Sequence, residues 1–231
     1  MSTDEVLSTH TFGRRLDQSA PVVTAGTRPG KDWERTAKRA FDVVGSLTGL
    51  LVLSPVLLAA AVLVKMTSPG PALYRQERIG LHGRRFRIWK FRSMSCGSDQ
   101  RVAQLMAEHG GYGPFYKMRE DPRITPVGRI LRRSSIDELP QLINVLKGEM
   151  SLIGPRPHVQ AEVDQYAPEH HRRLMMRPGI TGLWQISGRS EVSRHEAVQL
   201  DLYYVETWSL RRDLRILLKT AKAVVTARGA Y

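Results

Sequence analysis

The feature that most constrains this chain is an apolar run from Val43 to Val64, which is 22 residues long and contains no charged side chain. A straight helix of that length would extend roughly 33 Å, about the thickness of the hydrocarbon layer of a bilayer. A signal peptide is a poor interpretation, because a long polar segment precedes the run and no small-residue cleavage site follows it. A buried core helix seldom stays uncharged over this length. The run therefore predicts contact with a membrane.

Ser54-Pro55 interrupts this run near its middle. Proline inside a helix removes one backbone hydrogen bond and costs ~3 kcal/mol, although the hydroxyl of Ser54 could supply a partner for the freed carbonyl. Basic residues flank both ends of the run: Arg35, Lys38 and Arg39 before it, and Lys65, Arg75 and Arg78 after it. Positive charge favours the cytoplasmic side, so a single pass would place one cluster on the wrong side. We expect residues 31–66 to form a re-entrant membrane helix broken at Ser54-Pro55, with a kinked span as the alternative.

The charge of the chain is strongly and unevenly positive. The net charge is +13, from 35 Lys and Arg against 22 Asp and Glu, and residues 65–133 carry most of the excess. Such a block predicts an anionic partner: nucleic acid, a phosphorylated substrate or the anionic face of a membrane. Cys96 is the single cysteine, which excludes an internal disulfide framework and a CxxC metal or redox site.

The rest of the chain predicts an α+β fold that is mostly helical. Residues 1–30 are polar and without periodicity, which is typical of a flexible tail, and residues 67–231 are expected to form one cytoplasmic domain. Within it, residues 75–94 alternate apolar and basic side chains like a short hairpin, and residues 158–176 are expected to form one helix. The C-terminal stripe of Leu214, Leu217, Leu218, Ala221 and Val225 carries interspersed basic residues. Such a helix suits either a membrane surface or the protein core.

Asp137-Glu138 is the most informative acidic pair. A structural interpretation makes Ser135 the N-cap and Glu138 the N3 residue of a capping box. Pro140 would then occupy the helix interior, so placing Pro140 at the first helical position is easier and sets both carboxylates just outside the helix. Arginines crowd the preceding residues, at positions 123, 129, 132 and 133. These neighbours favour a catalytic interpretation of the pair.

Three Gly/Pro-containing loops each present one arginine, namely Arg156 in Gly154–Pro157, Arg177 in 177–179 and Arg189 in 188–190. A rigid turn reduces the entropy lost when a guanidinium binds phosphate. Together with Lys90, these loops predict a diphosphate site. P-loop, G-x-G-x-x-G, HExxH and D-x-D patterns are all absent from the sequence. His170-His171 and the adjoining Arg172-Arg173 are interpreted as a solvated helix face.

The segments 90–94 (KFRSM), 121–157 and 177–190, together with Ser54-Pro55 in its uncharged run, resemble the bacterial sugar transferases. These are monotopic phosphoglycosyltransferases that start polysaccharide assembly on polyprenyl phosphate. The resemblance covers about residues 34–230 and implies transfer of a sugar 1-phosphate from a UDP-sugar to undecaprenyl phosphate, with release of UMP. It places the enzyme on the cytoplasmic face of the bacterial inner membrane, among membrane lipids. The C-terminal segment looks most like members that use glucose or galactose.

The resemblance also implies roles for particular residues. Asp137 would be the nucleophile that forms an acyl-phosphate, and Glu138 would bind Mg²⁺ or assist proton transfer. Lys90, Arg132, Arg156 and Arg189 match family positions that hold phosphates, and Asp213 matches a further acidic position of the family. A covalent intermediate allows the soluble and lipid substrates to bind in turn.

Two other classes compete with this interpretation. A membrane-tethered nucleic-acid-binding protein would use the basic block, with Phe86, Trp89 and Phe91 stacking on bases. The basic residues lie beside Gly/Pro loops rather than on a recognisable binding fold, so we expect no nucleic-acid partner. A purely structural scaffold would leave the arginine loops and the acidic pair unexplained. A homo-oligomer is compatible with the sequence.

Overall fold

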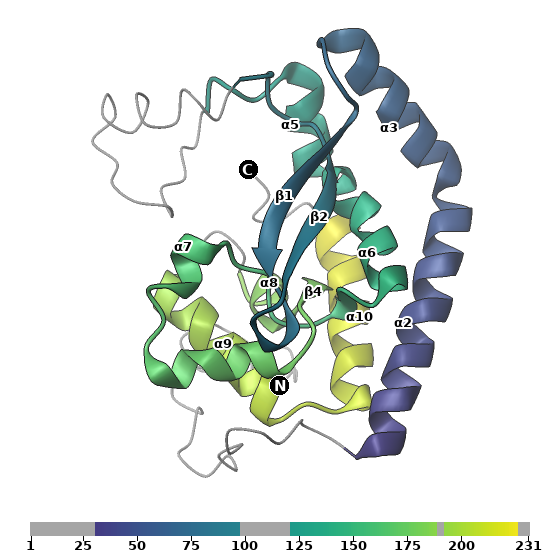
Figure 1. Cartoon of the computed structure of the whole chain (residues 1–231). Coiled ribbons are helices and arrows are strands. Elements are labelled where there is room, and N and C mark those ends of the chain that lie inside the picture. The colour runs from purple at the N-terminus through teal and green to yellow at the C-terminus, as the bar shows by residue number, and fades with distance from the viewer. Residues whose placement is uncertain (1–30, 98–120, 189–191, 226–231) are drawn as a thin grey trace, which may run out of the picture.

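The computed structural model describes residues 31–97, 121–188 and 192–225, and the tail predicted for residues 1–30 lies outside them. The described chain is mixed α+β and mostly helical, as predicted (Figure 1). Its α-helices are α2 (Asp32–Val52), α3 (Ser54–Thr67), α5 (Pro126–Arg133), α6 (Leu142–Lys147), α7 (Gln160–Val163), α8 (Leu183–Ile186), α9 (Arg194–Glu206) and α10 (Leu210–Val225). The 3₁₀ helices are η2 (Leu81–Gly83), η4 (Ile136–Gln141) and η5 (Pro168–Met175), and the strands are β1 (Leu73–Ile79), β2 (Arg85–Phe91), β3 (Ser151–Ile153) and β4 (Gly179–Thr181).

The strands form two small sheets. β1 and β2 form an antiparallel hairpin, which confirms the hairpin expected from the alternating pattern. Its register pairs Tyr74 with Lys90 and Arg78 with Phe86. Because side chains alternate between the two faces of a strand, Lys90 and Arg78 lie on the same face of the hairpin. β3 and β4 pair in parallel, with Ser151 opposite Gly179.

The apolar run forms two helices that meet at a break. α2 and α3 are bent by 62° relative to each other, with Leu53 between them. Pro55 cannot donate to the carbonyl of Leu51, and the hydroxyl of Ser54 donates to that oxygen at 2.8 Å. The partner expected for the freed carbonyl is therefore confirmed. In the described part of the chain no individual helix has the length and apolar composition of a membrane span, whereas the bent pair has both when its two helices are taken together.

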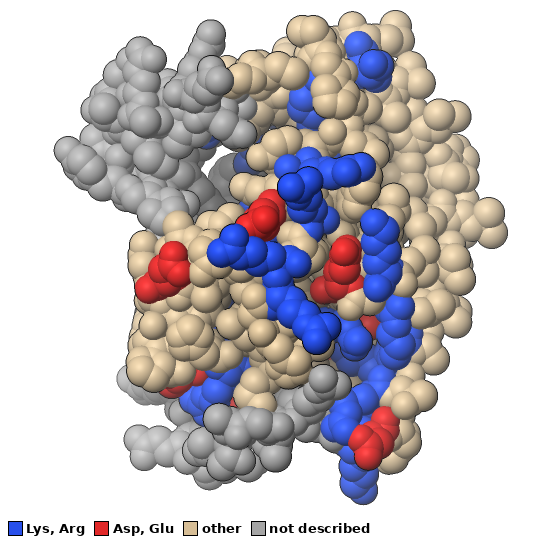
Figure 2. All heavy atoms as spheres, viewed as in Figure 1, with Lys and Arg blue, Asp and Glu red and all other residues tan. Residues whose placement is uncertain are grey.

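The polarity of α2 is inverted relative to an ordinary surface helix, whereas α3 is apolar on its buried side, at Ala60 and Val64, as well as on its outer side. The side of α2 that faces the protein buries Lys38, Asp42 and Ser46, four residues apart. The outer side leaves leucine and methionine exposed, with Leu51 at 77% and Met66 at 79% exposure. In Figure 2 this outer edge, on the right, is built almost entirely of uncharged residues. An apolar surface that faces outwards is the arrangement of helices that lie in lipid.

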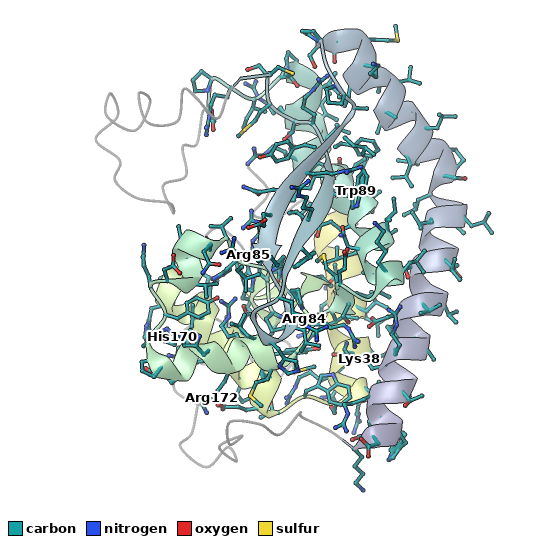
Figure 3. All side chains as sticks on the ribbon, in the orientation of Figure 1. Lys38, Arg84, Arg85, Trp89, His170 and Arg172 are labelled. Atoms are coloured by element: carbon teal, nitrogen blue, oxygen red, sulfur yellow. The ribbon has the colours of Figure 1, made fainter. Side chains whose placement is uncertain are left out.

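Two buried side chains fasten α2 to strand β3. Nζ of Lys38 donates to the carbonyl of Ile153 at 3.0 Å and forms a 2.6 Å ion pair with Asp213. Oδ1 of Asp42 accepts from the backbone N–H of Leu152 and from the hydroxyl of Ser151, both at 2.9 Å. Figure 3 shows Lys38 between α2 and α10. Helix α2 and the strand that precedes the Gly154–Pro157 turn are therefore held together.

The core lies between these elements in three apolar clusters. One gathers β3, α8 and the C-terminal helices around Ile153, Tyr204 and Ile216. A second joins α3 to β2 and α5 through Ala60, Val64, Phe91 and Leu131. The third packs α6 against β2.

Two expected elements differ from the structure. Residues 158–176 do not form one helix: α7 ends at Val163, and η5 starts afresh at Pro168, because proline cannot continue a helix but fits its first turn. The segment 177–190, expected as a loop, contains β4 and α8. The C-terminal helix is confirmed, but α10 buries Ile216 and leaves Leu214 51% and Leu218 65% exposed.

Candidate active site

The acidic pair, Asp137 and Glu138, lies in the first turn of η4. Ser135 adopts a left-handed conformation, with φ of 58°, and its side chain makes no capping hydrogen bond, so the expected capping box is wrong. The alternative with Pro140 at the first helical position is also wrong. The chain follows a 3₁₀ path through Pro140 and becomes α-helical only at Leu142. This sharp left-handed turn reverses the chain after α5 and directs the pair towards the hairpin.

Lys90 reaches the pair from β2. Its Nζ lies 2.6 Å from Oε1 of Glu138. The fully buried side chain of Asn144 fixes β2 at this point, because it accepts from the backbone N–H of Trp89 at 3.0 Å and donates to the carbonyl of Arg87 at 2.8 Å. The side chain of Asn144 thus joins α6, which directly follows η4, to the backbone of the strand just before Lys90.

The two carboxylates have opposite electrostatic environments. Burial and the neighbouring charge of Glu138 raise the pKa of Asp137 to about 6, although Lys90 and Arg132 oppose the shift. Burial alone would also raise the pKa of Glu138, but Lys90 and Arg156 outweigh it and hold that pKa at about 2. Neighbouring acids with diverging pKa values are typical of sites where the two groups perform different tasks.

Arg156 approaches the pair from the turn after β3. Its Nη1 lies 3.9 Å from Oε1 of Glu138, and its guanidinium is 5.7 Å from the ring centre of Trp184. The backbone of Arg156 is held as well, because its N–H donates to Asp201 at 3.3 Å and its carbonyl accepts from Arg173 at 3.2 Å. Glu138 and Trp184 thus contact the side chain of Arg156, while Asp201 and Arg173 hold its main chain.

The interpretation of Arg173 as part of a solvated helix face is wrong. Its side chain is 3% exposed and forms a buried ion pair with Asp201, beneath the Arg156 turn. A buried charge requires a partner, and Asp201 lies in a different helix, 28 residues further along the chain. A sequence pattern carries no signal of that pairing.

The turn that carries Arg156 depends on close backbone contact. A Cβ on Gly154 would lie 2.4 Å from the carbonyl oxygen of Arg177, and one on Gly179 would lie 2.1 Å from the nitrogen of Gly154. Only glycine allows the two arginine loops to cross at this distance. Arg177 itself points away from the acidic pair and donates to the carbonyl of Gly148 at 2.8 Å.

The structure places the remaining predicted residues as follows. Arg132 is close enough to lower the pKa of Asp137. Asp213 belongs to a different, structural network, in which it accepts from Lys38, Tyr204 and Trp208. Arg189 lies outside the described residues.

Arg78 is a site residue that the sequence reasoning missed. It lies on the same face of the hairpin as Lys90 and donates to the carbonyl of Pro157, next to Arg156, at 3.3 Å. Its positive charge lowers the pKa of Glu138. The like charge of Arg156 in turn lowers the pKa of Arg78. The alternation of β1 was the available signal, because it places Arg78 and Lys90 on one side once the hairpin register is known.

The acidic pair also lies next to the apolar helix pair. Ile136, which directly precedes Asp137, packs against the cluster formed by Ala60, Val64 and Leu131. The inner side of α3 therefore packs against the segment that carries the acidic pair.

Comparison with known proteins assigns this architecture to a class. The profile of the bacterial sugar transferase family matches residues 33–227, almost the whole described chain. The chain belongs to the bacterial sugar transferase family, as the resemblance implied.

Individual relatives agree with this assignment. The chain is 45% identical over 202 residues to the undecaprenyl-phosphate galactose phosphotransferase of Salmonella typhimurium, covering 85% of this chain and 42% of the relative. It is 45% identical over 218 residues to the UDP-glucose:undecaprenyl-phosphate glucose-1-phosphate transferase of Caulobacter vibrioides, covering 88% and 77%. An exopolysaccharide production protein of Sinorhizobium fredii, ExoY, is 43% identical, covering 84% and 88%. The chain thus spans less than half of the Salmonella protein but most of the other two.

Proposed function

We propose that this protein transfers a hexose 1-phosphate from a UDP-sugar to undecaprenyl phosphate and so starts the assembly of a polysaccharide or glycoconjugate. The observation that carries the proposal is the acidic pair inside a ring of cations, next to an exposed apolar helix surface. The printed names of the Salmonella and Caulobacter relatives support undecaprenyl phosphate as acceptor, and glucose or galactose as the sugar.

The carboxylate of Asp137 acts as the nucleophile. Its oxygen attacks the sugar-bearing phosphorus of the donor, and the bond from that phosphorus to the UMP oxygen breaks, so UMP leaves with the electron pair. The protein then carries the sugar phosphate as an acyl-phosphate on Asp137. In the second step an oxygen of undecaprenyl phosphate attacks the same phosphorus and releases the carboxylate. Two displacements allow each substrate to occupy the site in turn.

The cations around the pair stabilise the charge that accumulates on the phosphoryl oxygens. Lys90 and Arg156 both approach Oε1 of Glu138, so they lie beside the nucleophile rather than on it. A guanidinium can bind two phosphate oxygens at once, which favours Arg156 for the diphosphate of the donor. Arg132, whose charge acts on Asp137, favours the ionised nucleophile.

The residues present fit a magnesium ion. Within the described ranges no group of three or more metal-binding side chains occurs, and Mg²⁺ characteristically takes only one or two carboxylates together with substrate phosphates and water. Glu138, with its low pKa, would hold the ion beside Asp137. When bound, Mg²⁺ supplies neutralisation of the diphosphate charge. Turnover should therefore be lost in EDTA and return with added Mg²⁺.

The bent helix pair is proposed as a re-entrant anchor at the cytoplasmic face of the membrane. The inverted polarity of α2, with its polar side towards the protein, and the exposed apolar side chains of α3 support this arrangement. It would hold the acidic pair at the level of the lipid headgroups, where the phosphate of undecaprenyl phosphate lies.

The nucleic-acid alternative loses its main support. Phe86 and Phe91, two of the three aromatic residues available for stacking on bases, are only 9% and 4% exposed. The third, Trp89, is covered by the guanidinium of Arg75 at 3.7 Å from its ring centre.

Intact-protein mass spectrometry with the donor alone tests the proposal. The wild-type protein should gain the mass of one hexose phosphate and release UMP equal to the enzyme concentration before any lipid is added. Asp137→Asn should show neither, whereas Asp164→Asn, an exposed control, should behave as wild type. An unmodified wild-type mass with saturating donor and Mg²⁺ would exclude the covalent route, and an adduct on Glu138 would reverse the roles within the pair.

A further inference from the structure

Arg78 and Arg156 form a pair of cations that nothing in the established family assignment explains. Arg78 is mostly buried, with 14% of its side chain exposed. After burial itself, the strongest influence on its pKa is the charge of another guanidinium, that of Arg156. Burial and the charge of Arg156 lower the pKa of Arg78 to about 10, although Glu162 and Glu138 oppose the shift. Strongly perturbed ionisable groups cluster at functional sites, and an anion bound between two guanidinium groups would relieve their repulsion.

The contacts of Arg78 fix its guanidinium but leave part of it available. Nη2 donates to Oε1 of Gln76 at 2.6 Å, Nη1 donates to the carbonyl of Pro157 at 3.3 Å, and Glu162 lies 3.7 Å away. A guanidinium has five N–H donors, so two hydrogen bonds do not exhaust it. The amide of Gln76 and the carbonyl of Pro157 orient the group without neutralising its charge.

The charges around the site favour an anionic ligand. Four cations converge on it, at Arg78, Lys90, Arg132 and Arg156, while Glu138 and Glu162 are the carboxylates that oppose Arg78. Asp137 adds a third carboxylate, which with a pKa of about 6 is mostly ionised at neutral pH, so the cations still outnumber the carboxylates by one. A diphosphate supplies the missing negative charge.

We infer that Arg78 contacts the phosphates of a nucleoside diphosphate directly and forms a two-arginine clamp with Arg156. This inference rests on the proposed function, because the donor of that reaction carries the diphosphate. β1 supplies one arm of the clamp and the turn after β3 supplies the other, and the hydrogen bond from Arg78 to Pro157 sets the distance between them. The clamp would hold the diphosphate from one side while the acidic pair meets it from the other.

The binding of UDP and of inorganic pyrophosphate tests the clamp, measured by titration calorimetry on the detergent-solubilised full chain. Arg78→Lys keeps the charge but loses the planar fork, and it should weaken both ligands by about tenfold. Arg85→Lys is the matched control, because Arg85 lies on the same hairpin, 63% exposed and paired with Glu77, and it should leave both affinities unchanged. Equal affinities in Arg78→Lys and wild type would overturn the inference.

A double variant separates direct contact from an effect through Arg156. If Arg78 only positioned the Arg156 turn, Arg78→Lys would have no further effect once Arg156 is replaced by Ala. Direct contact requires a further loss, of about fivefold, in the Arg156→Ala background. No further loss would reduce Arg78 to a positioning residue and would overturn the clamp.

Glu162→Gln should strengthen ligand binding instead of weakening it, a result that a misfolded variant could not produce. The amide keeps an oxygen that can accept from the backbone N–H of Val159, as Glu162 does at 2.9 Å, but it no longer competes for the charge of Arg78. Pyrophosphate should then bind about threefold more tightly, and weaker binding would contradict the clamp.

UMP release by the wild type is measured separately from ligand binding. If the wild type turns over but ligand binding does not depend on Arg78, only the clamp is refuted. If binding depends on Arg78 but the wild type releases no UMP, only the proposed transfer is refuted.

Discussion

Nζ of Lys90 lies 2.6 Å from Oε1 of Glu138, so a lysine on a β-hairpin neutralises one member of the acidic pair. Among the described residues no such hydrogen bond reaches the adjacent Asp137, and burial dominates its ionisation. The two neighbours therefore differ in charge state: Glu138, with a pKa of about 2, is ionised at neutral and mildly acidic pH, and Asp137 has a pKa of about 6.

The first prediction concerns pH. The nucleophile must be ionised, and the pKa of Asp137 is raised to about 6, so kcat/KM for the donor should fall as the pH drops through 6. Below that value the loss should approach tenfold per pH unit, because the ionised fraction falls by that factor. Lys90→Gln should move this acidic limb to higher pH, since the charge of Lys90 lowers the pKa of Asp137. A profile that stays flat from pH 5 to pH 7 would show that Asp137 is not the titrating nucleophile.

The second prediction concerns Arg156. Arg156→Lys keeps the charge but loses the bidentate fork and the approach to Trp184. We expect kcat/KM for the UDP-sugar to fall by roughly 10- to 100-fold, the range of one charge-assisted bidentate contact. Sedimentation with membranes should be unchanged, which separates recognition of the donor from anchoring. Steady-state kinetics equal to those of wild type would remove Arg156 from the site.

The third prediction concerns Asp213, whose carboxylate lies in the core instead of at the acidic pair. Lys38→Met would leave the 1% exposed Asp213 charged and without its ion-pair partner, which should lower the free energy of unfolding by about 3 to 5 kcal/mol. Adding Asp213→Asn should recover part of this loss, because the amide removes the buried charge while its oxygen can accept from Trp208 and its NH₂ can donate to the hydroxyl of Tyr204.

Thermal unfolding and kinetics on the folded fraction measure the two effects separately. If Asp213 is structural, kcat per folded molecule should be the same in the wild type and in the double variant. A double variant that is as stable as wild type but inactive would return Asp213 to the catalytic machinery.

The sequence predicted the elements whose signals are local. The alternation of basic and apolar residues predicted the hairpin. Ser54-Pro55 predicted the break between α2 and α3 and the hydrogen bond from the hydroxyl of Ser54. The grouping of Lys90, Arg132 and Arg156 with the acidic pair followed from the resemblance, and the structure brings these residues together.

The errors arose where distant contacts decide the local conformation. Ser135 looks like an N-cap, but the left-handed turn that the packing of η4 requires prevents it from capping. Arg173 looks solvent-exposed, and only its ion pair with Asp201 in another helix explains its burial. Arg78 was not predicted as a site residue, because its position depends on the hairpin register and on its ion pair with Glu162. Neither can be read from the sequence alone.

The last prediction concerns the topology of the bent pair. If α2 and α3 form a re-entrant anchor, cysteines placed at Thr36 and at Ser68 should both resist a membrane-impermeant thiol reagent applied from the periplasmic side. The exposed Cys96 must first be replaced by serine, because it would otherwise react in disrupted cells and obscure the comparison. Labelling at one end alone would show that the pair crosses the membrane.

Pro55→Ala provides the matched variant for this experiment. Alanine restores the N–H that can donate to the carbonyl of Leu51, which the hydroxyl of Ser54 satisfies in the native chain, and removes the clash that favours the 62° bend. A straighter helix of this length is long enough to span, so a fraction of the molecules should expose one end to the periplasm. Ser54→Ala removes only the hydroxyl and leaves the proline in place, so it should keep the native topology. Equal labelling patterns for Pro55→Ala and the native chain would mean that the attachment of α2 through Lys38 and Asp42, rather than the proline, determines the fold of the anchor.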